Sequence, residues 1–233
     1  EAVSGEPIVE MQQPLAVESS AADHASKLIP ADNGEGFAFW YGASDASLIE
    51  AMADISPFVQ LAVIDDNAAT VDRLRHRLDA ARLYGRVTVH HADPGSFMPP
   101  RYVAHLVVVD SQLVAKSHET LLRSAYESVR PYGGAMQLMA TDNHAEIAAF
   151  IESLELEQAQ IEVQDHSVLV RRVGALPGSA DWTHQYGDIA NTIKSNDSRV
   201  KLPLGVLWFG GSSNLDVLPR HGHGPPKQVV GGR

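Results

Sequence analysis

The chain has 233 residues, of which 44% are hydrophobic, enough for one domain of ordinary size with a buried core and part of a second. Its 29 acidic and 18 basic residues give a net charge of −11, which disfavours nonspecific binding to nucleic acid or anionic membranes. The sequence lacks cysteine and any apolar run of about 18 residues, which excludes disulfides, thiolate metal sites, thiol nucleophiles and a membrane-spanning helix.

The two ends of the sequence predict an excerpt of a longer protein. The chain begins with Glu1 and shows no signal-peptide pattern, and residues 229–233 are typical of a hairpin that is cut short. Residues 1–20 contain prolines and little periodicity, which predicts a linker or an extension. Residues 21–29 are expected to form a short helix that ends at Pro30.

Residues 37–66 predict a strand, a tight turn, a helix and a second strand. The apolar run 37–41 ends at Gly42, apolar residues then recur at helical spacing, and a second apolar run, 61–64, ends at Asp65. A glycine turn lets a ligand approach the backbone, and an acid at the end of the second strand can accept hydrogen bonds from ribose hydroxyls. This unit therefore suits a nucleotide-like ligand.

The next segment predicts an amphipathic helix over residues 67–83. Its apolar residues recur at helical spacing, as in a helix that lies on a sheet, and Asp66 is expected either to point away or to cap this helix. Three arginines are expected on the solvated face of the helix, namely Arg73, Arg75 and Arg77.

Two strands follow, and an acid stands after each of them. Residues 87–91 precede Asp93, and the apolar residues 105–109 end at Asp110. The second run is nearly continuous, as expected for a parallel strand that is covered on both faces. One helix is predicted over residues 113–129.

The last part of the first domain predicts a fifth strand, a helix and a hairpin. A proline–glycine turn at residues 130–134 precedes the apolar residues 135–139. A helix is expected over residues 143–154, with Asp142 as its N-cap. Residues 161–170 contain two apolar runs around a polar turn, which predicts a closing antiparallel hairpin.

The order of these elements in residues 21–173 resembles the class I S-adenosylmethionine-dependent methyltransferase core. In that family a GxGxG turn follows the first strand; residues 42–46 align with it and keep only the first glycine. The GxGxxG turn of NAD-binding domains would need glycine at Ser44 and Ser47, and their parallel order has no closing hairpin. The resemblance implies an α/β fold with a Rossmann-like, mostly parallel sheet that ends in an antiparallel hairpin.

The same resemblance implies the residues of a cofactor site. The turn positions that would contact S-adenosylmethionine are Gly42, Ser44 and Ala46. Asp65 would hold the ribose hydroxyls, and Asp93 stands where the family contacts the adenine amino group. Asp110 stands where the fourth strand presents a catalytic or substrate-positioning residue. The two replaced glycines add side-chain bulk at the turn.

The composition changes at Gly174, where glycine and proline clusters replace helical periodicity. Residues 181–192 and 203–208 are similar to the opening blade of quinoprotein-type β-propellers, in which a W…GD…NT segment leads into a PL…W strand. This similarity implies that residues 174–233 are an incomplete first blade region and that the rest of the propeller is their partner. Pyrroloquinoline quinone (PQQ) would bind only in that missing propeller, and a periplasmic or other extracytoplasmic location is expected.

Three functional hypotheses follow. The first is a degenerate, noncatalytic methyltransferase-like domain of a larger quinoprotein, which retains binding of a nucleotide-type small molecule; the replaced glycines favour it. The second is an active S-adenosylmethionine-dependent methyltransferase, and the third is an NAD-linked oxidoreductase. His90 and His91 face opposite sides of a strand and are not expected to share a metal. His221 and His223 are expected in a turn of the propeller region; the alternative is that both lie on one side of an extended segment, with a metal or quinone-side role. No metal site is therefore predicted.

Overall fold

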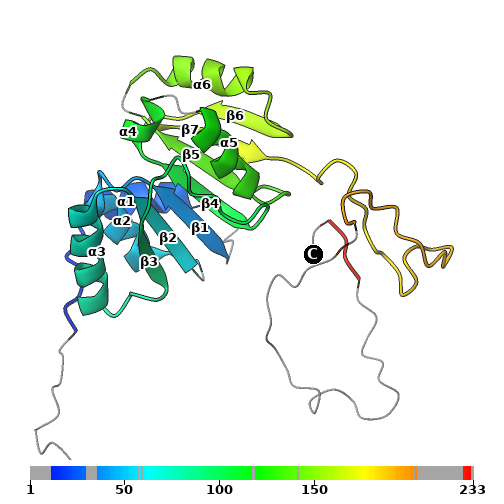
Figure 1. Ribbon diagram of the computed structural model, residues 1–233, viewed down its shortest axis with the longest axis horizontal. Coiled ribbons are helices and arrows are strands. Elements are labelled where there is room, and N and C mark those ends of the chain that lie inside the picture. The colour runs from blue at the N-terminus through cyan, green and yellow to red at the C-terminus, as the bar shows by residue number, and fades with distance from the viewer. Residues whose placement is uncertain are drawn as a thin grey trace, which may run out of the picture. The chain divides into compact units, whose positions relative to one another are not determined.

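The computed structural model describes residues 12–29, 36–56, 58, 60–116, 119–140, 142–201, 203 and 228–231. The chain divides into two compact units, Glu1–Val173 and Gly174–Arg233. The first is called the α/β unit below, and the second the C-terminal unit (Figure 1).

The α/β unit is built on one seven-stranded sheet with the strand order β3-β2-β1-β4-β5-β7-β6. Strands β1 to β5 are parallel, whereas β7 is antiparallel to both β5 and β6. The sheet thus confirms the predicted Rossmann-like order with its closing hairpin. The strands are β1 Phe37–Tyr41, β2 Gln60–Asp65, β3 Val87–His91, β4 Ala104–Val109, β5 Ala135–Met139, β6 Ala159–Val163 and β7 Ser167–Arg172.

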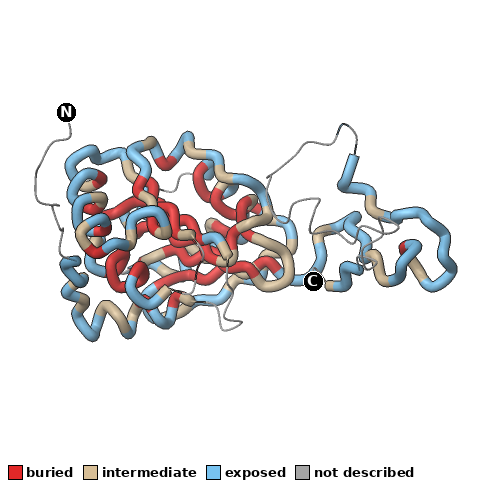
Figure 2. Tube along the Cα trace, turned by 90° about the horizontal axis from the view of Figure 1, so that it is seen from below, coloured by how far each residue is buried: buried red, intermediate tan, exposed pale blue. Residues whose placement is uncertain are grey.

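Helices cover both faces of the sheet. The helices are α1 Ser19–Leu28, α2 Ala46–Ile55, α3 Ala68–Ala80, α4 Ser111–Val114, α5 Glu119–Ser128 and α6 His144–Ser153. Because successive strand residues face opposite sides, Trp40 packs with α1, α2 and α3, while Phe39 and Tyr41 pack with α4, α5 and α6. The buried backbone in Figure 2 accordingly runs through the middle of this unit. None of the helices in the described residues is long and apolar enough to cross a membrane.

Two predictions about the helices were wrong in detail, and of the two alternatives for Asp66 the helix cap is excluded. The single helix expected over residues 113–129 is two helices: Asp110 caps the start of a four-residue α4, and Ala115 N–H closes that helix at its other end, before α5 begins. Asn67, and not Asp66, caps α3, since its side chain accepts from Thr70 N at 3.0 Å. Asn143 is the N-cap of α6 in place of Asp142; its φ of 61° is left-handed and its side chain makes no cap bond.

Two of the three arginines expected in solvent make tertiary contacts. Arg77 Nη2 lies 2.6 Å from Glu50 Oε2, a carboxylate that is buried on α2. Arg75 Nε donates to Val89 O at 2.9 Å. These contacts join α3 to its neighbours, whereas Arg73 bonds only to Thr70 of its own helix among the described residues.

The Glu50–Arg77 pair yields a stability prediction. Burial raises the pKa of Glu50 and Arg77 lowers it, so Arg77→Met leaves an unpaired buried carboxylate that costs about 1–2 kcal/mol of unfolding free energy at pH 7. A carboxyl whose folded pKa is raised destabilises the fold above that pKa, and the penalty fades as pH falls towards the unfolded value. Urea unfolding at pH 7 and pH 5 should therefore give a smaller loss at pH 5. Arg73→Met is the matched control, and an equal, pH-independent loss in both variants would contradict this account.

In the described residues of the C-terminal unit, polar contacts join both distant and neighbouring positions. Trp182 and Val229 exchange two backbone hydrogen bonds of 2.9 Å, and the Asp188 carboxylate accepts from Thr192 N at 3.1 Å. Strand pairing in the described part of this unit is limited to isolated bridges. The predicted Pro203–Trp208 strand lies almost wholly outside the described residues, as do His221 and His223, so the propeller resemblance stays a prediction.

Candidate functional site

A cleft lies beyond the carboxyl ends of β1, β2 and β4. The chain runs from β1 outward to β2 and β3, and then returns to place β4 on the other side of β1. Open parallel sheets bind ligands at such a reversal of strand order, because the loops on either side diverge there. The cleft has a volume of about 340 Å³.

Gly42 forms the turn between β1 and α2, and only glycine fits there. Its φ is +84°, and a Cβ at this position would lie 2.6 Å from Asp110 Cβ and 3.1 Å from Leu113 Cδ1. Its N–H donates to Ile64 O at 2.8 Å, which ties the turn to the end of β2. The first glycine of the predicted turn is therefore required by backbone conformation and by packing.

Ser44 and Ala46, which stand where the family has glycine, adopt backbone conformations that any residue can adopt. Neither Ser44 nor Ala46 has a positive φ, so neither position needs glycine for its conformation. Ser44 N donates to Asp110 Oδ2 at 3.1 Å, and the Ser44 hydroxyl donates to the same oxygen. Ala46 is the first residue of α2, whose N-cap Asp45 accepts from Leu48 N at 3.0 Å. The turn is altered in sequence and regular in geometry.

Asp65 lies at the end of β2 and lines the cleft. Its Oδ2 accepts from Ala43 N at 2.7 Å, and its Oδ1 accepts from Asn67 N at 2.7 Å. An ionised carboxylate has about four acceptor positions, so Asp65 keeps the capacity to accept two further hydrogen bonds. The side chain is only partly buried, which leaves it accessible from the cleft.

Asp110 is buried, with 5% of its surface exposed, and its carboxylate is already well used by the chain. Oδ1 accepts from Gln112 N at 2.9 Å, while Oδ2 accepts both donors of Ser44. The carboxylate therefore fixes the turn after β1 against the start of α4. This arrangement positions the walls of the cleft, and it leaves little capacity for proton transfer to a ligand.

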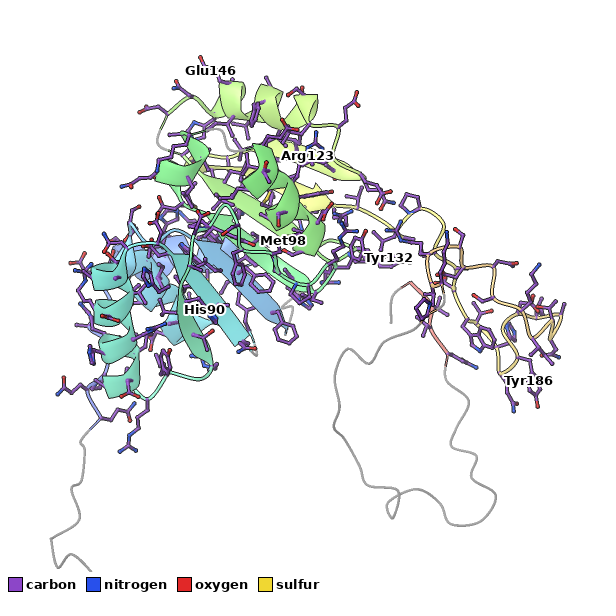
Figure 3. The ribbon with its side chains drawn as sticks, viewed as in Figure 1. His90, Met98, Arg123, Tyr132, Glu146 and Tyr186 are labelled. Atoms are coloured by element: carbon purple, nitrogen blue, oxygen red, sulfur yellow. The ribbon has the colours of Figure 1, made fainter. Side chains whose placement is uncertain are left out.

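Asp93 does not line the cleft, but the next residue does. Asp93 is exposed and its Oδ1 accepts from Gly95 N at 3.0 Å, whereas Pro94 is buried against the cleft. His90 lies at the end of β3 (Figure 3). Its ring packs against Phe97, with ring centroids 6.0 Å apart. Within the described residues, no group of three or more potential ligands could hold a metal ion.

The sequence did not single out several residues of the cleft wall. Asn67 and Thr70 enter it from the first turn of α3, and Gln112 from α4. The sequence could have indicated these three residues only by position, because they follow shortly after β2 and β4, the two strands that are followed by Asp65 and Asp110 or end in them. Arg73 and Lys116 add positive charge to the lining.

Two further cavities lie at the same edge of the sheet, beyond the ends of β4 and β5. The smaller one, of about 170 Å³, shares Ser44 and Asp110 with the cleft. The larger one, of about 310 Å³, lies between α4 and α6 and is lined by Met139, Phe150 and Glu146 among others. Figure 3 shows Glu146 on α6. Met139, at the end of β5, lines both of these cavities.

Neither a protein-family model nor a curated protein sequence matches the chain. Solved structures do match. A Methanococcus maripaludis protein that is proposed to be an S-adenosyl-L-methionine-dependent methyltransferase aligns with a TM-score of 0.51 and 13% identity, over 71% of this chain and 96% of that one.

Two further structures show the same likeness. The S-adenosylmethionine-dependent methyltransferase SibL aligns with a TM-score of 0.50 and 21% identity, over 63% of this chain and 53% of its own. The [4+2]-cyclase SpnF aligns with a TM-score of 0.51 and 13% identity, over 61% and 58%. A cyclase among these structures shows that the fold does not fix the reaction. The α/β unit thus has the fold of class I S-adenosylmethionine-dependent methyltransferases.

Proposed function

We propose that the α/β unit binds S-adenosylmethionine in the cleft and is an S-adenosylmethionine-dependent methyltransferase. The observation that carries the proposal is the Asp65 carboxylate, which lines the cleft next to the Gly42 turn and keeps acceptor capacity for two hydroxyls. The ribose of the cofactor offers two neighbouring hydroxyl donors to such a carboxylate. S-adenosylmethionine would supply an electrophilic methyl group on a sulfonium ion.

The residues of the cleft fit this cofactor in shape and charge. Gly42 leaves the turn without a side chain where the nucleoside would approach the backbone. The cleft volume of about 340 Å³ lies in the range of small-molecule sites. The buried carboxylate of Asp110 at its wall is complementary to a positively charged sulfonium. Methyl transfer often needs positioning alone, so the lack of a free base in Asp110 does not oppose it.

A second candidate is a noncatalytic domain of a larger quinoprotein. The N–H groups of Ala43 and Ser44 already donate to Asp65 and Asp110, so the turn offers a ligand fewer donors than an open glycine turn would. The resemblance of the C-terminal unit to a propeller blade, with the extracytoplasmic location that it implies, favours the same candidate. Binding of the cofactor without methyl transfer to any acceptor would support it.

Calorimetry with the 233-residue chain tests the proposed site. S-adenosylmethionine should bind, and Asp65→Ala should weaken it by about 1–3 kcal/mol, or roughly 5- to 150-fold, through loss of charge-assisted bonds to ribose. Asp79→Ala, which changes a carboxylate of α3 outside the cleft lining, is the control and should leave the affinity unchanged. Equal affinity of the wild type and Asp65→Ala would mean that the ligand does not use Asp65. Binding of NAD in place of S-adenosylmethionine would favour an oxidoreductase.

A further inference from the structure

Two histidines from distant parts of the sequence line the small cavity beside the cleft. His24 lies on α1 and His166 in the turn between β6 and β7, and their ring centroids are 5.5 Å apart. This cavity shares Ser44 and Asp110 with the cleft. A group bound between the histidines is therefore next to a ligand that occupies the cleft.

The fold does not use the nitrogen atoms of these two rings. Within the described residues, neither the His24 ring nor the His166 ring forms a hydrogen bond. The other ring nitrogens at the end of β3 are engaged, since His90 Nε2 lies 3.1 Å from Thr88 Oγ1 and His91 Nε2 lies 3.1 Å from Asp66 O. His24 and His166 thus retain their donors and acceptors for a ligand.

We propose that His24 and His166 form a proton-linked site for a carboxylate group. Given the proposed function, on which this inference rests, the carboxylate is that of the amino-acid tail of S-adenosylmethionine or S-adenosylhomocysteine. The cavity wall also holds the carboxylates of Asp45 and Asp110, which are complementary to the ammonium group of the same tail. The cavity thus offers a partner to each charge of an amino acid.

The electrostatics of the pair link binding to pH. Burial lowers the pKa of His24, with a further lowering by His166 and by Lys27, and Asp45 opposes them. His24 is therefore neutral at neutral pH, whereas a carboxylate in the cavity favours the charged imidazolium. Binding takes up a proton, so affinity must rise as pH falls. Both histidines also line a second cavity, of about 220 Å³. The other charged groups that line these two cavities are Asp45, Asp110, Lys27 and Asp165.

A pair of ligands isolates the tail from the nucleoside. S-adenosylhomocysteine carries the amino-acid tail, whereas 5′-methylthioadenosine has the same nucleoside and thioether without it. Calorimetry between pH 7.5 and pH 5.5 should show S-adenosylhomocysteine binding roughly 3- to 10-fold tighter per pH unit, the upper limit being one proton taken up. The affinity for 5′-methylthioadenosine should stay constant. The double variant His24→Gln, His166→Gln should lose the pH dependence for S-adenosylhomocysteine and keep its affinity for 5′-methylthioadenosine.

His76 provides a control for the histidine variants. His76→Gln changes an exposed histidine of α3 away from both cavities, and should behave as the wild type. If 5′-methylthioadenosine binds and S-adenosylhomocysteine gains nothing on acidification, the inference is overturned while the proposed function stands. The same holds if the double variant keeps the wild-type pH dependence. If neither ligand binds at any pH, the proposed function fails and the inference fails with it.

Discussion

Gly42→Ala is expected to lower the free energy of unfolding by about 2–5 kcal/mol and to abolish binding in the cleft. An alanine at φ +84° is strained, and its Cβ would meet Asp110 Cβ at 2.6 Å. Asp110 cannot move aside freely, because its carboxylate holds Ser44 on one side and Gln112 on the other. The substitution therefore displaces the turn that forms one wall of the cleft. Urea unfolding and calorimetry with S-adenosylmethionine measure the two effects.

Substitutions at two other glycines measure the cost of backbone strain without a contact like that with Asp110. Gly85 and Gly133 have φ values of +107° and +100°, and a Cβ at either position meets nothing within 4 Å. Alanine there should cost only the strain of about 1–2 kcal/mol and leave ligand affinity unchanged. If Gly42→Ala lowers the unfolding free energy no more than these two controls do, the inference that Asp110 packs closely on the turn is wrong.

The second large effect is expected from Arg172→Ala at the end of β7. The Arg172 side chain is 2% exposed, and its guanidinium carbon lies 4.2 Å from the ring centroid of Tyr126. Its Nη2 donates to Tyr126 O at 3.0 Å, and its Nη1 lies 3.7 Å from Glu157 Oε2. Truncation removes the cation–π contact and one of the two donors to Tyr126 O, which keeps the bond from Val129 N, at a cost of about 2–4 kcal/mol of unfolding free energy.

Arg171 provides the control for this prediction within the same strand. It is partly exposed on the opposite face of the sheet, and its Nη1 donates to Gly133 O at 3.3 Å. Arg171→Ala should therefore cost well under 1 kcal/mol, as is usual for surface substitutions. Chemical denaturation of both variants gives the comparison. Similar losses of unfolding free energy at the two positions would show that the buried contacts of Arg172 do not stabilise the packing of β7 on α5.

The sheet could be predicted because its signals are local. Trp40 and Val63 lie in short apolar runs bounded by turn residues, so the strands could be inferred without knowledge of any contact. Their arrangement in one sheet was implied by the resemblance to the methyltransferase core. Gly42 and Asp65 were found for the same reason, since each stands directly at the end of such a run. The expected hairpin was also correct, because its two apolar runs are separated only by a polar turn.

The sequence could not show contacts between residues that are far apart in the chain. Asp110 and Ser44 are 66 positions apart, and nothing local indicates that the carboxylate holds the turn in place. The same carboxylate caps the start of α4, and Ala115 N–H closes that helix after one turn. The pattern of apolar residues shows neither contact, so it predicted one helix. The pairing of His24 with His166 arises only when the hairpin meets α1.

A crystal structure of the chain with S-adenosylhomocysteine would show directly whether Asp65 holds the nucleoside. Both ribose hydroxyls are expected within hydrogen-bonding distance of the Asp65 carboxylate, beside an unchanged Gly42 turn. The two bonds from Ala43 N and Asn67 N to Asp65 should persist, because the carboxylate has capacity for all four donors. A nucleoside bound away from Asp65, or an empty cleft at a saturating concentration of the ligand, would contradict the account.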